Sequence, residues 1–169
     1  MALEFHAPWS SSLKTVSRVA VCILLSVAVA GILLMPARLP AVRFLMFGVP
    51  LGILVAALLF MVSGYTLTAT ALEVQRPLWT TSFALAELLS VTGDPEALQG
   101  SLRLFGNGGI FSFSGIFWNR KLGIFHAYGT DPGRAVVLKF RKRTIVITPD
   151  DTQHFIVRVR THLAAAAHE

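Results

Sequence analysis

Charged residues and cysteine are both scarce in this chain. The scarcity of charge argues against a fully soluble protein, and the scarcity of cysteine excludes disulfide bonds within the chain. The 169 residues include one cysteine, Cys22. A disulfide framework and a cysteine metal site within one chain are therefore excluded. Charged residues make up 14% of the sequence and hydrophobic residues 54%, whereas a soluble domain usually carries about 25% charged residues. The composition predicts a chain that is partly embedded in a membrane.

The missing charge is concentrated in the first third of the sequence. Between residues 19 and 62 the only charged side chains are Arg38 and Arg43. Uninterrupted apolar runs cover residues 19–35 and 44–62, and about 17–25 apolar residues are enough to span a bilayer. Two prolines between the runs would end the first helix. We therefore expect a tail at 1–18, a transmembrane helical hairpin at 19–63 and a domain at 64–169.

The first run also allows a second interpretation, as a cleaved signal peptide. Lys14 and Arg18 would be its basic region, and Ala28 and Ala30 supply small residues for a cleavage site. However, the run is long for a signal peptide and a second apolar run follows at once, which favours an anchor. Basic residues near the spans number three on the side of the termini and two in the connection; they are Lys14, Arg18 and Arg76 against Arg38 and Arg43. This bias favours a cytoplasmic location for both termini.

Small residues recur every four positions in the second run, at Gly48, Gly52 and Ala56. This spacing places them on one helix face, where small side chains let two helix backbones approach closely. We expect a helix-packing seam here, either toward the first span or toward another subunit. The alternative is ordinary use of glycine and alanine in a membrane helix.

From Tyr65 onward the hydrophobic period changes from that of a helix to two, which is typical of half-buried strands. The turn signals Gly93-Asp94-Pro95 and Thr130-Asp131-Pro132-Gly133 separate the strands, and the glycine-rich residues 106–109 are expected to form a loop. Strands are predicted within residues 65–76, 79–84, 102–105, 110–119, 123–128, 134–140 and 144–148.

The last segment has the signals of an amphipathic helix. Thr148 is a suitable N-cap and Pro149 a suitable first helical residue. Phe155 and Val159 recur on one face of such a helix, so that this face would be buried. A helix at residues 149–166 is therefore expected to close one end of a barrel or sandwich of seven or eight short strands.

Stretches throughout the chain carry a resemblance to a known family. They are residues 7–10, 65–76, 85–88, 104–111, 115–119, 122–123 and 144–151. Together they resemble bacterial pleckstrin-homology (PH)-like domains of the membrane-attached kind. The resemblance implies an α+β membrane protein, with a two-helix transmembrane hairpin followed by a PH-like β-barrel or sandwich and a C-terminal capping helix. It also implies a place in the bacterial inner membrane; it does not transfer a ligand.

No catalytic or cofactor-binding pattern stands out. The glycines at 106, 108 and 109 lack the further glycine of a dinucleotide loop, since Phe111 occupies that position. Ser114 is not in a Gly-x-Ser-x-Gly elbow, and the five histidines do not have the spacing of metal ligands. We expect no catalytic residue, no cofactor and no metal, and therefore a protein that is not an enzyme.

Positive charge is concentrated between Arg103 and Arg143, where eight basic residues accompany the single acid Asp131. Phenylalanines in this zone alternate as core residues do, so nucleic acid is not an expected partner. The alternative to a binding role is solvated turn tips. Candidate contacts with anionic lipid or an acidic partner are Arg120, Lys121, Arg134, Lys139, Arg141, Lys142 and Arg143.

These observations predict a membrane-anchored, non-enzymatic interaction module. Its PH-like domain would bind a protein, a peptide or an anionic lipid surface. The alternative is a structural or accessory subunit of a larger membrane complex, assembled through the small-residue seam.

Overall fold

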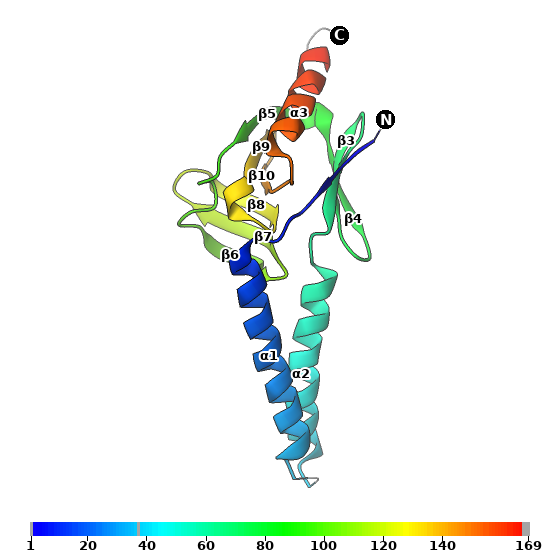
Figure 1. Cartoon of the computed structure of the whole chain (residues 1–169), viewed down its shortest axis with the longest axis vertical. Coiled ribbons are helices and arrows are strands. Elements are labelled where there is room, and N and C mark those ends of the chain that lie inside the picture. The colour runs from blue at the N-terminus through cyan, green and yellow to red at the C-terminus, as the bar shows by residue number, and fades with distance from the viewer. Residues whose placement is uncertain (1, 37, 167–169) are drawn as a thin grey trace.

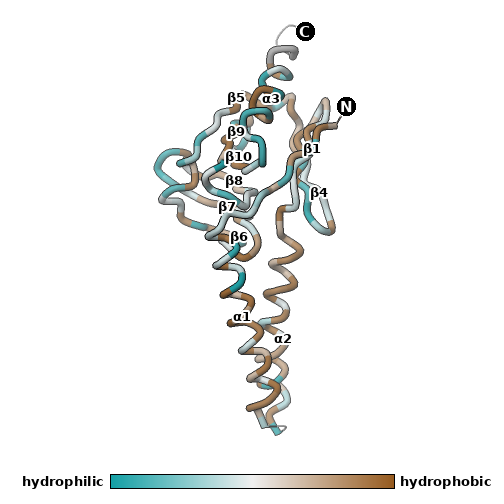
Figure 2. The backbone as a smooth tube through the Cα atoms, in the orientation of Figure 1, coloured by the Kyte–Doolittle hydropathy of each residue, from teal (hydrophilic) through white to brown (hydrophobic). Residues whose placement is uncertain are grey.

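Two long helices project side by side from a β-rich domain, with the connection between them at the far end (Figure 1). The computed structural model describes residues 2–36 and 38–166. Residue 1 of the predicted tail, residue 37 of the predicted connection and residues 167–169 of the predicted domain lie outside the described residues. Helix α1 covers Ser11–Leu33 and helix α2 covers Pro40–Leu59. Both are long and apolar enough to cross a membrane, and Figure 2 shows that they are mostly apolar, with hydrophilic segments at the start of α1 and near the connection.

Helix α1 begins at Ser11, well before the predicted span. Ser10 is the N-cap, and its hydroxyl accepts a hydrogen bond from the Leu13 amide at 3.2 Å. Leu13 and Ser17 are almost completely buried. The first two turns of α1 therefore pack against the β domain on the side of Leu13 and Ser17.

The two helices pack closely against each other at Gly31. A Cβ atom on Gly31 would lie 2.6 Å from the Cβ of Met46, so a larger residue cannot be placed there without a shift. Ala28, Leu54 and Ala57 are also buried. Most other apolar side chains of the hairpin are exposed. Lipid is the solvent in which such a surface is stable, since every backbone polar group within a helix is already paired.

The smaller sheet contains four antiparallel strands in the order β1-β2-β3-β4. Their bounds are Leu3–His6, Gly64–Leu67, Ala71–Gln75 and Thr80–Ala84. The prediction that residues 1–18 form only a tail misses β1, which pairs with β2 in the register Phe5 to Tyr65. Pairing with β2 places the N-terminal strand at the edge of this sheet, with Phe5 in the core.

The larger sheet contains six strands in the order β5-β9-β10-β8-β7-β6, with β10 parallel to β8 and the other pairs antiparallel. No strand is shared between the two sheets, so the β domain is an open sandwich, not a closed barrel. Short 3₁₀ turns at Leu85–Glu87 and Pro132–Arg134 connect strands. The strands are β5 (Leu88–Gly93), β6 (Leu102–Ile110), β7 (Ser112–Asn119), β8 (Gly123–Gly129), β9 (Val136–Phe140) and β10 (Thr144–Ile147).

The predicted glycine loop at 106–109 is wrong, because β6 continues through it. Gly106 and Gly115 face each other across β6 and β7, and both have positive φ, 108° and 151°. A Cβ on Gly106 would lie 2.4 Å from the Ser114 carbonyl oxygen. Glycine is required here for the close approach of two strands and not for a turn.

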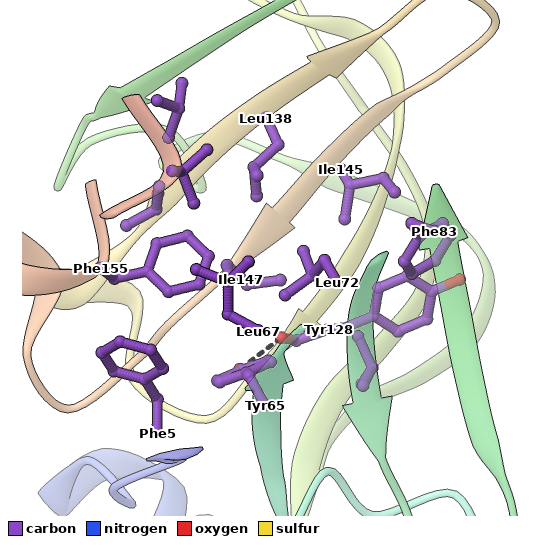
Figure 3. Close-up of a cluster of buried hydrophobic side chains, with 14 of the residues drawn as sticks. Phe5, Tyr65, Leu67, Leu72, Phe83, Tyr128, Leu138, Ile145, Ile147 and Phe155 are labelled. Atoms are coloured by element: carbon purple, nitrogen blue, oxygen red, sulfur yellow. Dashed lines mark hydrogen bonds between the residues drawn. The ribbon is translucent and has the colours of Figure 1, made fainter. Parts of the chain in front are cut away.

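The main core lies between the small sheet, strands β5, β9 and β10, and helix α3 (Thr152–Ala166). Phe155 of α3 points toward Ile147 and Phe5, and Phe83 lies beside Tyr128 (Figure 3). The predicted apolar face of the helix is confirmed, since Phe155 and Val159 are fully buried. Each such side chain contributes about 1.5–3 kcal/mol by leaving water.

The predicted start of this last helix needs correction. Asp151 is the cap, because its carboxylate accepts a hydrogen bond from the His154 amide at 2.9 Å. Thr148 is buried instead. Its hydroxyl accepts a hydrogen bond from the Thr130 amide at 2.9 Å, and its own amide donates to the Tyr65 hydroxyl at 3.1 Å. Thr148 therefore joins strands of both sheets and does not cap α3.

Candidate functional site

The larger sheet has one covered face and one that is covered only in part. Phe117, Phe125 and Val146 lie on the outer face, where they pack with Ala97 of the β5–β6 connection. Asn119 fixes this connection by donating a hydrogen bond from its side-chain amide to the Ala97 carbonyl at 2.8 Å. The outer face of β7 and β8 is therefore closed by the protein itself.

The inner face packs on the small sheet at β9 and β10 but continues beyond it across β8, β7 and β6. Leu102 lies opposite Trp118, which lies opposite Ile124. Two residues earlier in β7, a second row runs in the same way across the three strands: Phe105 lies opposite Ile116, which lies opposite His126. We call these two rows the open face; its residues are Leu102, Phe105, Ile116, Trp118, Ile124 and His126.

The open face is unusually exposed to solvent for a surface that consists mainly of apolar side chains. The exposed fractions are 61% for Leu102, 75% for Phe105, 39% for Trp118 and 64% for Ile124. Single exposed hydrophobic residues are common on any protein. A contiguous apolar patch across three strands is instead a property of interaction surfaces.

The strands of the open face contain no acidic side chain, and the positive charge of Arg143 acts on it from the side. Residues 102–129 contain no aspartate or glutamate. Arg143 lies 6.0 Å from the ring of Phe83, at the border between the open face and the core. Partial burial lowers the pKa of His126 from its ordinary value, and the positive charge of Arg143 lowers it further. An occupant with negative charge would therefore be favoured over a basic one.

A pocket of about 460 Å³ lies below the open face, where α2 meets β6 and β7. Ile53, Ala56 and Phe60 contribute its apolar wall from α2. Asn107 and Ser114 contribute polar groups from the two strands, and no acidic residue lines it. We call this space the juxtamembrane pocket.

Arg76 is the dominant charge of the juxtamembrane pocket. Its guanidinium carbon lies 5.7 Å, 5.5 Å and 5.2 Å from the ring centres of Phe60, Trp79 and Tyr128. Burial lowers the pKa of Arg76, and the Tyr128 side chain partly opposes this effect. One terminal nitrogen donates to the Ser114 hydroxyl at 3.3 Å, whereas the buried Nε has no hydrogen-bond partner among the described residues.

The structure distributes the seven predicted basic residues over separate turns and faces. Lys121 forms a salt bridge with Asp94 at 2.5 Å, and Arg134 one with Asp131 at 3.4 Å. Their role in binding remains a prediction; of the seven, Arg143 acts electrostatically on His126 of the open face. The other members are Arg120 in the β7–β8 turn, Lys139 on the outer face of β9, and Arg141 and Lys142 in the β9–β10 turn.

The predicted small-residue seam of α2 does not face α1. The α2 residues that are buried are Pro50, Leu54 and Ala57. Gly52 is exposed, and a Cβ atom added to it would have no neighbour within 4 Å. The seam could therefore contact another molecule, and such a contact remains a prediction.

Sequence reasoning missed Arg76 and the open face. Arg76 entered that reasoning only as a flanking charge, because α2, β3 and β7 are far apart in sequence. The alternation of Leu102, Trp118 and Ile124 with core residues was visible, but their strand neighbours were not. Among the described residues there is no group of three histidine, cysteine, aspartate or glutamate side chains that could hold a metal ion.

Two apolar helices, an open two-sheet sandwich and a helix buried against its core define a membrane-anchored domain of the PH type. The family model described as "Bacterial PH domain" matches residues 63–163, which is more than half of the chain. The chain therefore belongs to the bacterial PH domain family, and the resemblance found in its sequence is confirmed. Comparisons with curated proteins and with solved structures return no match. Family membership indicates an interaction domain, since such domains are generally non-catalytic.

Proposed function

We propose that this protein is a membrane-anchored, non-enzymatic interaction module that binds a segment of a protein partner on the open face. The observation that carries the proposal is the exposed row Leu102–Trp118–Ile124, in register across three strands. Aromatic residues near the centre of such a patch are common anchors of protein interfaces. The positive charge around the row favours a segment that is apolar and acidic.

The distance of this row from the membrane helices favours a protein over a bilayer as its occupant. Ser112, at the start of β7, donates a hydrogen bond to the Phe60 carbonyl at the end of α2 at 3.4 Å. Trp118 lies near the other end of the same strand, and the six steps from Ser112 to Trp118 cover about 20 Å at ~3.3 Å per residue. The row is therefore held above the end of the helices.

The proposed location is the bacterial inner membrane, with the β domain in the cytoplasm. Basic residues flanking the helices support this orientation, and the exposed apolar surface of the hairpin supports insertion. The second candidate function is a structural subunit, favoured by the exposed and uncontacted position of Gly52.

Photo-crosslinking of the full chain in its membrane tests the proposal. We would place p-benzoylphenylalanine at Trp118, at Ile124 and, as a control, at Glu73 on the other side of the small sheet. A protein adduct of one mass at positions 118 and 124, absent at 73 and weakened by Arg143→Glu, is the expected result. Sequencing of the crosslinked peptide should give an acidic and apolar segment. Equal adducts at all three positions, or no protein adduct at 118, would refute the proposal.

A further inference from the structure

We infer that the juxtamembrane pocket is a binding site for one anionic phospholipid. Arg76 would receive the lipid phosphate, and an acyl chain would lie along the exposed side of α2 from Ala56 toward Gly52. This site shares only Phe105 with the open face, and it differs from the open face in its other residues and in its ligand.

The state of Arg76 supports an anion as the missing partner. Its guanidinium is half-buried among three aromatic rings and makes no salt bridge with any described residue. Its Nε is buried without an acceptor. A buried donor without an acceptor is costly, and more so when it is charged. A phosphate oxygen would supply that acceptor and, as arginine geometry favours, a second contact through a terminal nitrogen.

Charge selects the kind of headgroup. Arg103 also lines the pocket, and no aspartate or glutamate does. A zwitterionic headgroup would bring a cation toward these two arginines without a carboxylate to receive it. An anionic headgroup avoids this repulsion, so phosphatidylglycerol is a better fit than phosphatidylcholine.

The walls of the pocket select a lipid over a free phosphate. Ile53, Ala56 and Phe60 face it from the last two turns of α2 and the residue after them. This is the part of a membrane helix that meets the boundary of headgroups and acyl chains. Phe105, which also lines the pocket, is 75% exposed, and Leu78, next to Trp79 in the sequence, is 72% exposed. Beyond the pocket, a Cβ atom added to Gly52 would have no neighbour within 4 Å, so this face of α2 has room for an acyl chain.

Native mass spectrometry of the full-length protein, released from nanodiscs of phosphatidylglycerol and phosphatidylcholine, tests the site. We expect retained phosphatidylglycerol at one molecule per chain. Retention of phosphatidylcholine should be about ten-fold weaker, because its choline cation would be repelled by the two arginines. Arg76→Gln should remove the preference and Arg76→Lys should reduce it. Arg160→Gln, which removes an exposed charge on α3, is the matched control and should change nothing.

A second variant keeps the test decisive if Arg76→Gln destabilises the fold. Ala56→Leu would fill the apolar end of the pocket and should lower retention, whereas Gly48→Leu, two turns away on the same face, should not. A soluble glycerophosphoglycerol headgroup should not compete at equal concentration; effective competition would assign the site to free phosphate esters. Equal retention of the two lipids, or full retention by Arg76→Gln and Ala56→Leu, would overturn the inference.

Discussion

The hydroxyl of Ser17 in α1 accepts a hydrogen bond from the backbone amide of Phe111 at 2.9 Å. The same hydroxyl donates to the carbonyl of Gly109 at 3.4 Å. Phe111 has a φ of 63° and is the only non-glycine residue with positive φ among those that the structure describes. The tight turn between β6 and β7 is thus bonded directly to the first membrane helix, which couples the anchor to the sheet that carries the open face.

Replacement of Ser17 by alanine should destabilise the junction. The Phe111 amide would lose its acceptor, and the expected cost is about 1–3 kcal/mol. Thermal unfolding of the full chain in detergent, followed by near-ultraviolet circular dichroism, should show a lowered Tm. Ser26→Ala, at an exposed position of the same helix, is the matched control. An unchanged Tm for Ser17→Ala would mean that this contact contributes nothing to stability.

Replacement of Tyr65 by phenylalanine should destabilise the core. The Tyr65 hydroxyl donates to the Tyr128 carbonyl at 2.6 Å and accepts from the Thr148 amide at 3.1 Å. Phenylalanine leaves both buried groups unpaired, at a cost of about 1–3 kcal/mol each before relaxation. Chemical unfolding should show the loss. Tyr128→Phe, whose hydroxyl forms no hydrogen bond with a described residue, should cost clearly less; equal losses would contradict the assignment.

Tyr65 also predicts a loss of stability in alkali. Burial raises the pKa of Tyr65 to about 12, while hydrogen bonds with Thr148 act in the opposite direction. Because the folded-state pKa is raised above the unfolded value near 10, the neutral phenol is favoured by folding. Its contribution is complete below about pH 10 and declines as the pH rises toward about 12. Unfolding midpoints measured across this range should fall more steeply for the wild type than for Tyr65→Phe.

His126 provides a probe of the charge on the open face. Partial burial first, and the nearby Arg143 charge second, lower its pKa from the ordinary value. Imidazole resonances of the full chain in micelles, with His126→Gln used for assignment, should give a pKa below that of a free histidine. Arg143→Gln should raise it, and Lys139→Gln, on the outer face, should leave it unchanged. A His126 pKa that is the same in the wild type and in Arg143→Gln would contradict the proposed positive potential on the open face.

Substitution in the small-residue seam separates a lipid-facing helix from a subunit contact. A Cβ atom added to Gly52 would have no neighbour within 4 Å, so the fold should be retained in Gly52→Leu. If α2 faces lipid, size-exclusion chromatography with light scattering in detergent should give the same mass for wild type and variant. A larger wild-type mass that falls on Gly52→Leu would support the structural-subunit alternative.

Local patterns predicted much of the fold because they act over a few residues. Period-two alternation located β2 and β3, and turn residues located the hairpin around Arg120 and Lys121. Strand β1 was missed because it is four residues long and its partner begins at Gly64, beyond both membrane helices. The glycines of β6 were misread because close strand approach and turns favour the same residue.

The candidate site was harder to predict because it depends on contacts between distant segments. Arg76 becomes a pocket residue only when Phe60 of the α2 end and Ser114 of β7 are brought to it. Thr148 has the sequence signal of a helix cap, but the hydrogen bonds with Tyr65 and Thr130 decide its position. The seven basic residues are close in sequence, yet their strands carry them to different faces.

The central claim is that a membrane-inserted hairpin holds the open face outside the bilayer. Spin labels at Gly52→Cys and Trp118→Cys, each in a Cys22→Ala background and reconstituted in liposomes, test it by power-saturation spectroscopy with oxygen and a polar nickel chelate. The account predicts that oxygen relaxes the label at position 52 more, and that the chelate relaxes the label at 118 more. Preferential relaxation by the chelate at both positions would show that the hairpin is not inserted, and preferential relaxation by oxygen at 118 would place the open face in lipid.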